Sequence, residues 1–536
     1  MWFLVIFPVL IITLYKVRKI YTYWKGRGVP YCVHPLHCFG LFSENALRIN
    51  CYSDVFEELY YKFKNKRYIG FYNFFQPVLL IRDPNLLKRI CVKDYHAFSV
   101  HSEAIPLNLD EQWSKNMYAE TNTQRWQKLR TSMTPSFTSN KLKSSFPAVE
   151  QFAIEFVNYL RESIDKNVTV NMLEIIRRVL SDITVNAYFG VKCDSLREPK
   201  NIVHLMVHEA MTLPCFHGFT HLCSRVCPKL LQLLGVKVYK ASVQNFFAEM
   251  MERRLQLEFE NGFKPYDIIT ALPELQGVKF SNTEKLNRSL IDDITGHAFL
   301  LTFAGYETTV TTLMSLLYEL TVNDVVQENL YRDIIQTLDK YNGNVCYESV
   351  KAMEYLESAI EGNNLIFSGR LRMLSLSFAC TIWFSFSRKG SVEIEVLRLH
   401  PPAPVIDRLA TVNYEIKAEH PNEEDVVIEK GTPIWILAKA IQNDADYFPD
   451  PKKFNPDRFL SKNRHTVAQY TNIPIGAGPR SCPGYRYGIL QVKVIIVNLL
   501  LNFKLLPTEQ TYVRKSSKTY TIRKHGVWVH LKTRLK

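Results

Sequence analysis

The chain has 536 residues, of which 47% are hydrophobic, so it can bury a large core, and no linker rich in Pro, Ser or Gly divides its middle. Its 66 Lys and Arg outnumber 52 Asp and Glu, giving a formal net charge of +14, which favours an acidic protein or an anionic membrane surface as partner. Nucleic acid is disfavoured, because the sequence has neither a long Lys/Arg block nor zinc-finger spacing. The eleven scattered cysteines are odd in number, which argues against a complete disulfide framework, and we expect reduced thiols that face the cytosol.

The first fifteen residues carry no charge, and Lys16 begins a basic flank directly after them. This apolar run is short for a membrane span, but Lys16 can extend its charged end towards the interface. No small-residue cleavage site follows, which disfavours a secretory peptide that is removed. We therefore predict an uncleaved membrane anchor over residues 1–20 with the rest of the chain on the cytosolic side, a hinge linker over 21–30 and one large domain over 31–536.

Short strands and long helices follow one another along this large domain. Val78 to Ile81 predicts a strand, and Asp83-Pro84 then opens a helix. Residues 150–265 are mostly helical in pattern. The sequence therefore predicts a mainly α fold with a small β-rich portion at one end.

Trp126 and Arg130 stand four residues apart in a predicted helix, so their side chains lie on one face. An ordinary amphipathic helix explains this pair equally well. A role for it depends on the other motifs.

A helix of unusual length is predicted over 292–320, and it holds Ala304-Gly305-Tyr306-Glu307-Thr308-Thr309. A glycine and paired threonines in mid-helix work against helix propensity. We expect the Thr308 hydroxyl to bond to a carbonyl one turn back and to open or bend the helix there. The alternatives are a slightly weak buried helix and a groove with a function.

Glu395 and Arg398 form an i, i+3 pair on a helix that the prolines 401 and 402 end. Such pairs are usually solvated and contribute little to stability. A third charged partner is available in Phe454 to Phe459, which contains Arg458.

The most informative stretch is Ile475 to Gly484, which reads Ile-Gly-Ala-Gly-Pro-Arg-Ser-Cys-Pro-Gly. The glycines allow tight turns and a close approach to a flat ligand. With Cys482 as N-cap and Pro483 at the first helical position, the helix that follows would stabilise a thiolate of low pKa. A free cysteine in a glycine-rich turn is the ordinary alternative. Because no second Cys or His stands at metal-ligand spacing, a zinc site is disfavoured, whereas a single ligand suits an iron held in a porphyrin.

This stretch resembles the haem-binding loop of a cytochrome P450, Phe-x-x-Gly-x-Arg-x-Cys-x-Gly, with Ile475 in place of the phenylalanine. The resemblance implies that Cys482 ligates the haem iron, that Thr308, Glu307 and Ala304 form the oxygen-activation motif, and that Glu395, Arg398 and Arg458 form a structural triad. It also implies contacts with the haem, an iron protoporphyrin IX with an axial thiolate, from Trp126, Arg130, Arg408, Arg480, Ile475, Gly476, Gly478 and Gly484.

The same resemblance implies the cytochrome P450 fold and a membrane-bound monooxygenase of the endoplasmic reticulum, or microsomes, similar to the arthropod detoxification and vertebrate drug-oxidising clan. Its substrates would be O2 and apolar small molecules, including xenobiotics. Electrons would come from NADPH through cytochrome P450 reductase, with cytochrome b5 as a further partner. Two alternatives stay open: an isomerase or dehydratase that needs no reductase, and a non-catalytic product.

The second alternative follows from an interruption. Residues 361–393 have no counterpart in the resemblance, and no Asp or Glu occurs from Gly362 to Val392. We hypothesise a retained intron or an error in the gene structure. Pro483 is a smaller departure, because it lacks an N–H that a thiolate could accept.

Overall fold

The computed structural model describes residues 2–32, 52–73, 75–102, 111–163, 169–211, 223, 227–237, 239–261, 288–356, 392–421, 423–512 and 525–534. Its α-helices are α1 (Trp2–Tyr21), α3 (Tyr52–Lys62), α4 (Pro84–Lys88), α5 (Glu111–Ser114), α6 (Thr123–Met133), α7 (Ser139–Ser163), α8 (Met172–Phe189), α9 (Ile202–Met211), α11 (Pro228–Leu233), α12 (Ala241–Asn261), α14 (Arg288–Val322), α15 (Asp324–Asp339), α16 (Tyr347–Ala352), α18 (Val392–Leu399), α19 (Ala438–Gln442) and α20 (Tyr485–Asn502).

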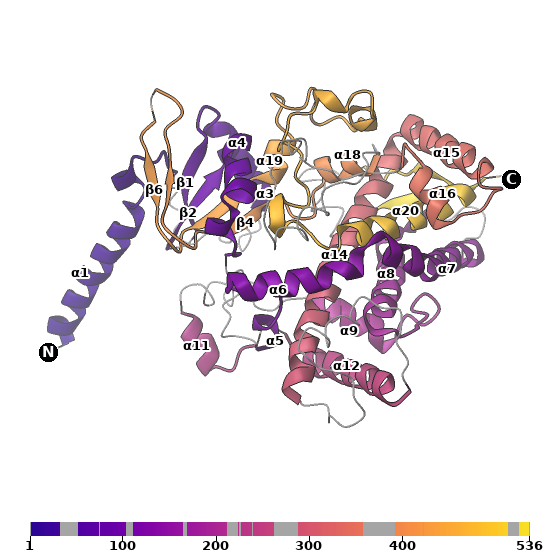
Figure 1. Cartoon of the computed structure of the whole chain (residues 1–536), viewed down its shortest axis with the longest axis horizontal. Helices are drawn as coiled ribbons and strands as arrows, with labels where there is room; N and C mark the ends of the chain where they lie inside the picture. The colour runs from indigo at the N-terminus through magenta and orange to yellow at the C-terminus, as the bar shows by residue number, and fades with distance from the viewer. Residues whose placement is uncertain are drawn as a thin grey trace, which may run out of the picture.

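The strands are β1 (Tyr68–Asn73), β2 (Gln76–Ile81), β3 (Thr169–Asn171), β4 (Ile406–Leu409), β5 (Tyr414–Ile416), β6 (Val426–Ile428), β7 (Pro433–Ile436), β8 (Phe503–Pro507) and β9 (Trp528–Thr533). Figure 1 shows the helices gathered in one body, with β1, β2 and β4 at the end of the molecule from which α1 projects. The predicted mainly α fold with a small β-rich portion is confirmed.

The larger sheet joins distant parts of the chain in the order β1-β2-β7-β4. The first two strands form an antiparallel pair, and β2 then runs parallel to β7, with Leu80 opposite Trp435. In the antiparallel pair of β4 and β7, Arg408 lies opposite Ile434. This register fixes Arg408 within a buried sheet, where its side chain is only 1% exposed.

The strand and helix predicted around residue 80 are both present. Asp83 accepts a hydrogen bond from Leu86 N at 2.6 Å and Pro84 follows at the first helical position, so α4 begins where the sequence indicates. A single π-helical turn, Arg89–Lys93, continues it.

At the N-terminus, α1 exposes large apolar side chains, including Phe7, Ile11 and Leu14. Within the described part of the chain, no helix combines the length and the hydropathy that crossing a membrane requires. The segment expected as a hinge linker packs on β1. Trp24 is fully buried there, and its indole N–H donates to Phe71 O at 3.0 Å.

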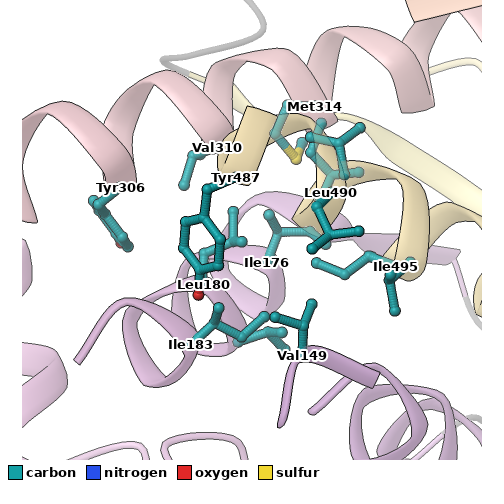
Figure 2. Packing of buried hydrophobic residues seen from close by; sticks show 14 of the residues in the cluster. Val149, Ile176, Leu180, Ile183, Tyr306, Val310, Met314, Tyr487, Leu490 and Ile495 are labelled. Atoms are coloured by element: carbon teal, nitrogen blue, oxygen red, sulfur yellow. The ribbon is translucent and has the colours of Figure 1, made fainter. Parts of the chain in front are cut away.

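The helical core forms where α14 packs against α8 and α20 (Figure 2). Val310 and Met314 of α14 lie against Leu180 of α8 and Leu490 of α20 there. Apolar residues cover most of the circumference of α14, which is why most of this helix is buried. It runs slightly beyond the predicted range of 292–320 at both ends.

Candidate functional site

Cys482 lies in the loop between the 3-10 turn Gly478–Arg480 and α20. The expectation that it caps the helix is wrong, because Gly484 is the N-cap and Cys482 precedes it by two residues. Two features hold the cysteine away from the helix: its backbone N–H donates to Ile475 O at 3.0 Å, and Ser481 is extended. The loop therefore closes on itself before the helix starts.

Two of the loop glycines are required by the backbone. Gly476 and Gly478 have φ of +82° and +71°, a region that disfavours side chains. A Cβ on Gly478 would also lie 1.9 Å from the carbonyl oxygen of Cys91. Gly478 thus lets the loop pass directly against the turn that follows α4.

The thiol of Cys482 is in an enclosed yet accessible place. Its surface is exposed, but burial raises its pKa, and this effect outweighs the opposing charge of Arg130 and the hydrogen bonds from Gly484 N and Tyr485 N. The sulfur is thus surrounded by protein atoms that disfavour its charge, although the residue keeps accessible surface. The expected low pKa of the thiol is wrong for this reason, and a thiolate here requires a further cation beside the sulfur.

Three arginines converge near the cysteine. The positive charge of Arg130, on α6, favours the thiolate form of Cys482. Burial, followed by the charges of Arg408 and Arg130, lowers the pKa of Arg480 to about 9. The guanidinium of Arg480 also lies over the ring of Trp126, with its Cζ 3.9 Å from the ring centre. Cations held this close repel one another, so the site favours an anionic ligand.

A neighbouring polar cluster was missed by the sequence reasoning. Asp407, directly before Arg408, accepts hydrogen bonds from Ser102 and Tyr118 and contacts His101. The spacing of these residues in the sequence does not predict the cluster, because they come from three separate segments. The one available signal was an acidic residue beside an arginine already assigned to the site.

The motif on α14 faces the same region. Ala304 and Thr308 are exposed although the helix around them is buried, and Glu307 is half-buried. The Thr308 hydroxyl donates to Ala304 O at 2.5 Å, which confirms the predicted bond one turn back. Gly305 is needed here too, because a Cβ would lie 2.6 Å from the Tyr188 hydroxyl.

Tyr188 connects this helix to the cysteine loop. Its hydroxyl touches α14 at Gly305, and its pKa is raised by burial and by the charge of Cys482. The oxygen-activation motif and Cys482 therefore border one region, and Tyr188 lies between them.

The predicted triad is assembled, with Glu395 and Arg398 fully buried and Arg458 partly buried. Arg398 donates to both carboxylate oxygens of Glu395, at 2.7 and 2.8 Å, and Arg458 Nε lies 3.3 Å from the same carboxylate. Arg398 also donates to Gln442 O at 2.8 Å. The pair is thus not the solvated kind that contributes little.

The comparisons with known proteins agree with this geometry. Residues 35–361 and 392–528 match the cytochrome P450 family. The chain belongs to the cytochrome P450 family. Cytochrome P450 6j1 of Blattella germanica is 28% identical over 502 residues, which cover 93% of this chain and 90% of the relative. Cytochrome P450 9e2 of the same insect is 27% identical over 515 residues (92% and 89%). Probable cytochrome P450 6a20 of Drosophila melanogaster is 29% identical over 494 residues (91% and 90%).

A cytochrome P450 binds haem through an axial cysteine thiolate, and the function of this chain is that of a haem-thiolate monooxygenase. The described residues fit this cofactor. An enclosed thiol with two backbone N–H donors suits an axial ligand, and the cluster of Arg130, Arg408 and Arg480 suits the two carboxylates of haem. No three His, Cys, Asp or Glu side chains of the described residues come together as a metal site.

Proposed function

We propose that this cytochrome P450 oxidises apolar small molecules, xenobiotics among them, in the space bordered by Cys482 and the middle of α14. The observation that carries this proposal is the exposure of Ala304 and Thr308 in the middle of a buried helix, next to an enclosed cysteine. The side chain of Ala304 and the methyl group of Thr308 give an apolar substrate an apolar contact there.

Cys482 is the proposed axial ligand. When bound, the haem supplies the activation of O2 and the oxidising power, which no side chain has. Gly484 N and Tyr485 N each donate to the sulfur and hold its negative charge in place. Ile475, Gly476 and Gly478 shape the loop that presents it.

The roles proposed for α14 follow from its local geometry. Ala304 leaves room beside the site because its side chain is a single methyl group. The Thr308 hydroxyl, which bonds to Ala304 O, can turn to donate to a ligand in the groove. Glu307, adjacent and half-buried, is the group that can pass a proton to that hydroxyl.

Arg130, Arg408 and Arg480 are the proposed partners of the haem carboxylates. The ring of Trp126 packs against the guanidinium of Arg480 and holds it in position. A carbon-monoxide difference spectrum of the reduced protein tests the assembled site. We expect the Soret band of a thiolate-ligated haem, and a band typical of a histidine-ligated haem, or none, would contradict the proposal.

An isomerase or dehydratase would need no reductase. The pairing of Glu307 with Thr308 favours oxygen activation, since that chemistry requires protons at the bound oxygen. Turnover of an apolar substrate should therefore depend on NADPH and cytochrome P450 reductase. Conversion of a hydroperoxide at the same rate without either would favour the alternative.

For location, we propose the endoplasmic reticulum membrane, with the large domain in the cytosol and α1 at the membrane. The support is the exposed apolar surface of α1, which projects from the body, and its basic end at Arg18 and Lys19 (Figure 1). The exposed Leu233 and Leu234, at the end of α11, offer a second apolar contact. Cytochrome P450 reductase and cytochrome b5 are the proposed partners of the positively charged chain.

Removing residues 1–20 tests the membrane proposal. We expect the shortened protein to leave the microsomal fraction and to keep its haem spectrum. A shortened protein that remains with the membranes as fully as the whole chain would contradict a leading role for α1.

We also propose that residues 361–393 are an insertion foreign to the family, derived from a retained intron or from an error in the gene structure. The family match leaves residues 362–391 outside its two stretches, and α18, which carries Glu395 and Arg398, begins directly after them. Sequencing of spliced transcript across the segment tests this idea. Finding its codons in mature message would refute the intron, and poor haem retention by the full chain would then favour a non-catalytic product.

A further inference from the structure

Both carboxylate oxygens of Asp407 have hydrogen-bonding partners. Its Oδ2 accepts from Ser102 N at 2.7 Å and from Ser102 Oγ at 2.8 Å. Its Oδ1 accepts from Tyr118 Oη at 3.1 Å and lies 3.1 Å from His101 Nδ1. A carboxylate takes this many donors only when it is ionised, so Asp407 is a fixed negative charge in the site.

This arrangement fixes the imidazole of His101. An ionised carboxylate only accepts, so Nδ1 carries the hydrogen that points to Asp407. The ring also stacks on Tyr118, with centres 4.2 Å apart and planes 20° from parallel. Nε2 is then the acceptor of a neutral ring, and among the described residues the hydrogen bond of this ring is the one at Nδ1.

The charges that face His101 are those of Asp407 and Arg408 on β4 and Arg480 in the cysteine loop, with the Tyr118 phenol beside them. Burial lowers the pKa of His101 most, and the two arginines lower it further against the opposing effect of Asp407. The ring is therefore neutral at pH 7. Its Nε2 lone pair lies within the electrostatic field of two arginines, Arg408 and Arg480.

We propose that His101 takes up one proton when a carboxylate enters the site and then donates its Nε2–H to that carboxylate, with Asp407 holding the ring in position. This inference rests on the proposed haem-thiolate function. The proton comes from solvent and forms the Nε2–H bond, while the bound carboxylate stays anionic and Asp407 keeps its charge.

The physical reason is a change in the electrostatic balance. Burial is the main reason that the imidazole is neutral, and the charges of Arg408 and Arg480 add to this effect. A bound carboxylate offsets the field of these two arginines, so protonation of the ring becomes more favourable. It would also face the Nε2 lone pair of a neutral ring, and the repulsion ends only when that nitrogen is protonated. A charge-assisted hydrogen bond from Nε2–H to the carboxylate then replaces the repulsion between the Nε2 lone pair and a carboxylate lone pair.

Two molecules can supply the carboxylate: the haem, through a propionate, or an acidic substrate. Histidine-selective 13C and 15N NMR of the ferrous carbon-monoxide form distinguishes them, because that form is diamagnetic. The titration is recorded without additive, with lauric acid, and with dodecan-1-ol as a neutral ligand of equal length. His101→Gln assigns the signal.

If a haem propionate is the ligand, His101 titrates above the ordinary value of about 6.5 without any additive. If the substrate supplies the carboxylate, the pKa rises only with lauric acid and not with dodecan-1-ol. A pKa that stays low in all three samples, although the thiolate-type band is normal, would overturn this inference alone. A wild-type protein without that band would overturn the proposed function as well.

Haem transfer to apomyoglobin gives a second measure for the propionate case. Raising the pH through the raised pKa removes the Nε2–H, so haem release from the wild type should accelerate about tenfold. His101→Arg keeps a permanent cation and His101→Gln never has one, so neither should show this pH dependence. Asp407→Asn should weaken it. His96→Gln, which changes an exposed histidine five residues earlier, should leave the pH profile unchanged.

Discussion

Two groups of arginines in this molecule differ in what faces them. Arg398 and Arg458 share the carboxylate of Glu395, and each also donates to a backbone carbonyl. Arg130 and Arg480 instead act on each other across the candidate site. A cation whose partner belongs to the chain stabilises the fold. A cation kept next to other cations raises the energy of the empty site, and an anionic ligand lowers it again.

The difference teaches which arginines to assign to structure and which to binding. In the first group, the loss of one partner leaves a buried charge uncompensated, so the whole fold weakens. In the second group, loss of one cation relieves repulsion within the protein. It weakens the binding of the ligand and leaves the fold stable. Substitutions at four positions test this distinction and the role of the cysteine.

The largest effect is expected from Cys482→Ala or Cys482→Ser, because neither side chain can supply a thiolate. The purified variant should lose the thiolate-type Soret band of the reduced carbon-monoxide form completely. Cys91→Ala, which changes a buried cysteine with no proposed role, is the control and should keep the band. An unchanged Soret band in the Cys482 variants would contradict the assignment of Cys482 as the haem ligand.

Glu395→Gln should come next, since it leaves Arg398 and Arg458 without a buried countercharge. We expect the free energy of unfolding to fall by about 3–5 kcal/mol, measured by denaturant titration of the haem-bound protein. Asp446→Asn removes the partner of Lys64 in an exposed pair and should cost less than about 1 kcal/mol. Equal losses of unfolding free energy in the two variants would show that the triad stabilises the fold no more than an exposed ion pair does.

Arg130→Gln should affect the ligand and spare the fold. Haem release to apomyoglobin should accelerate by about ten- to a hundredfold, as expected for one charge-assisted hydrogen bond. The α-helical circular dichroism should be unchanged. Lys128→Gln is the matched control, because this exposed lysine stands two residues earlier on α6. A variant that unfolds like Glu395→Gln would place Arg130 in the structural group.

The smallest effect is expected from Pro483→Ile. Gly484 N and Tyr485 N already donate to the sulfur, and the proline between them and Cys482 has no N–H. A third donor would draw negative charge from the thiolate and make the iron easier to reduce. Potentiometric titration should therefore give a higher reduction potential, and an unchanged or lower one would count against this account.

Much of the local structure was predictable, because it depends on neighbours in the chain. The Asp83-Pro84 cap, the length of α14 and the hydroxyl bond of Thr308 each follow from residues within one or two helical turns. The start of α20 was placed two residues too early. The loop's hydrogen bond from Cys482 N to Ile475 O spans seven residues, and no cap signal reports it.

The sequence by itself determined the mainly helical fold, the motifs and the ligand type that they imply, because turn glycines, helix periodicity and a lone cysteine after an arginine are local properties. Only the tertiary structure decided which charges are compensated. It brought His101, Tyr118 and Asp407 together from separate segments, and it enclosed the thiol of Cys482, which raises the pKa of that thiol. Desolvation and Coulomb interactions depend on everything within several ångströms in space, whatever the separation along the chain.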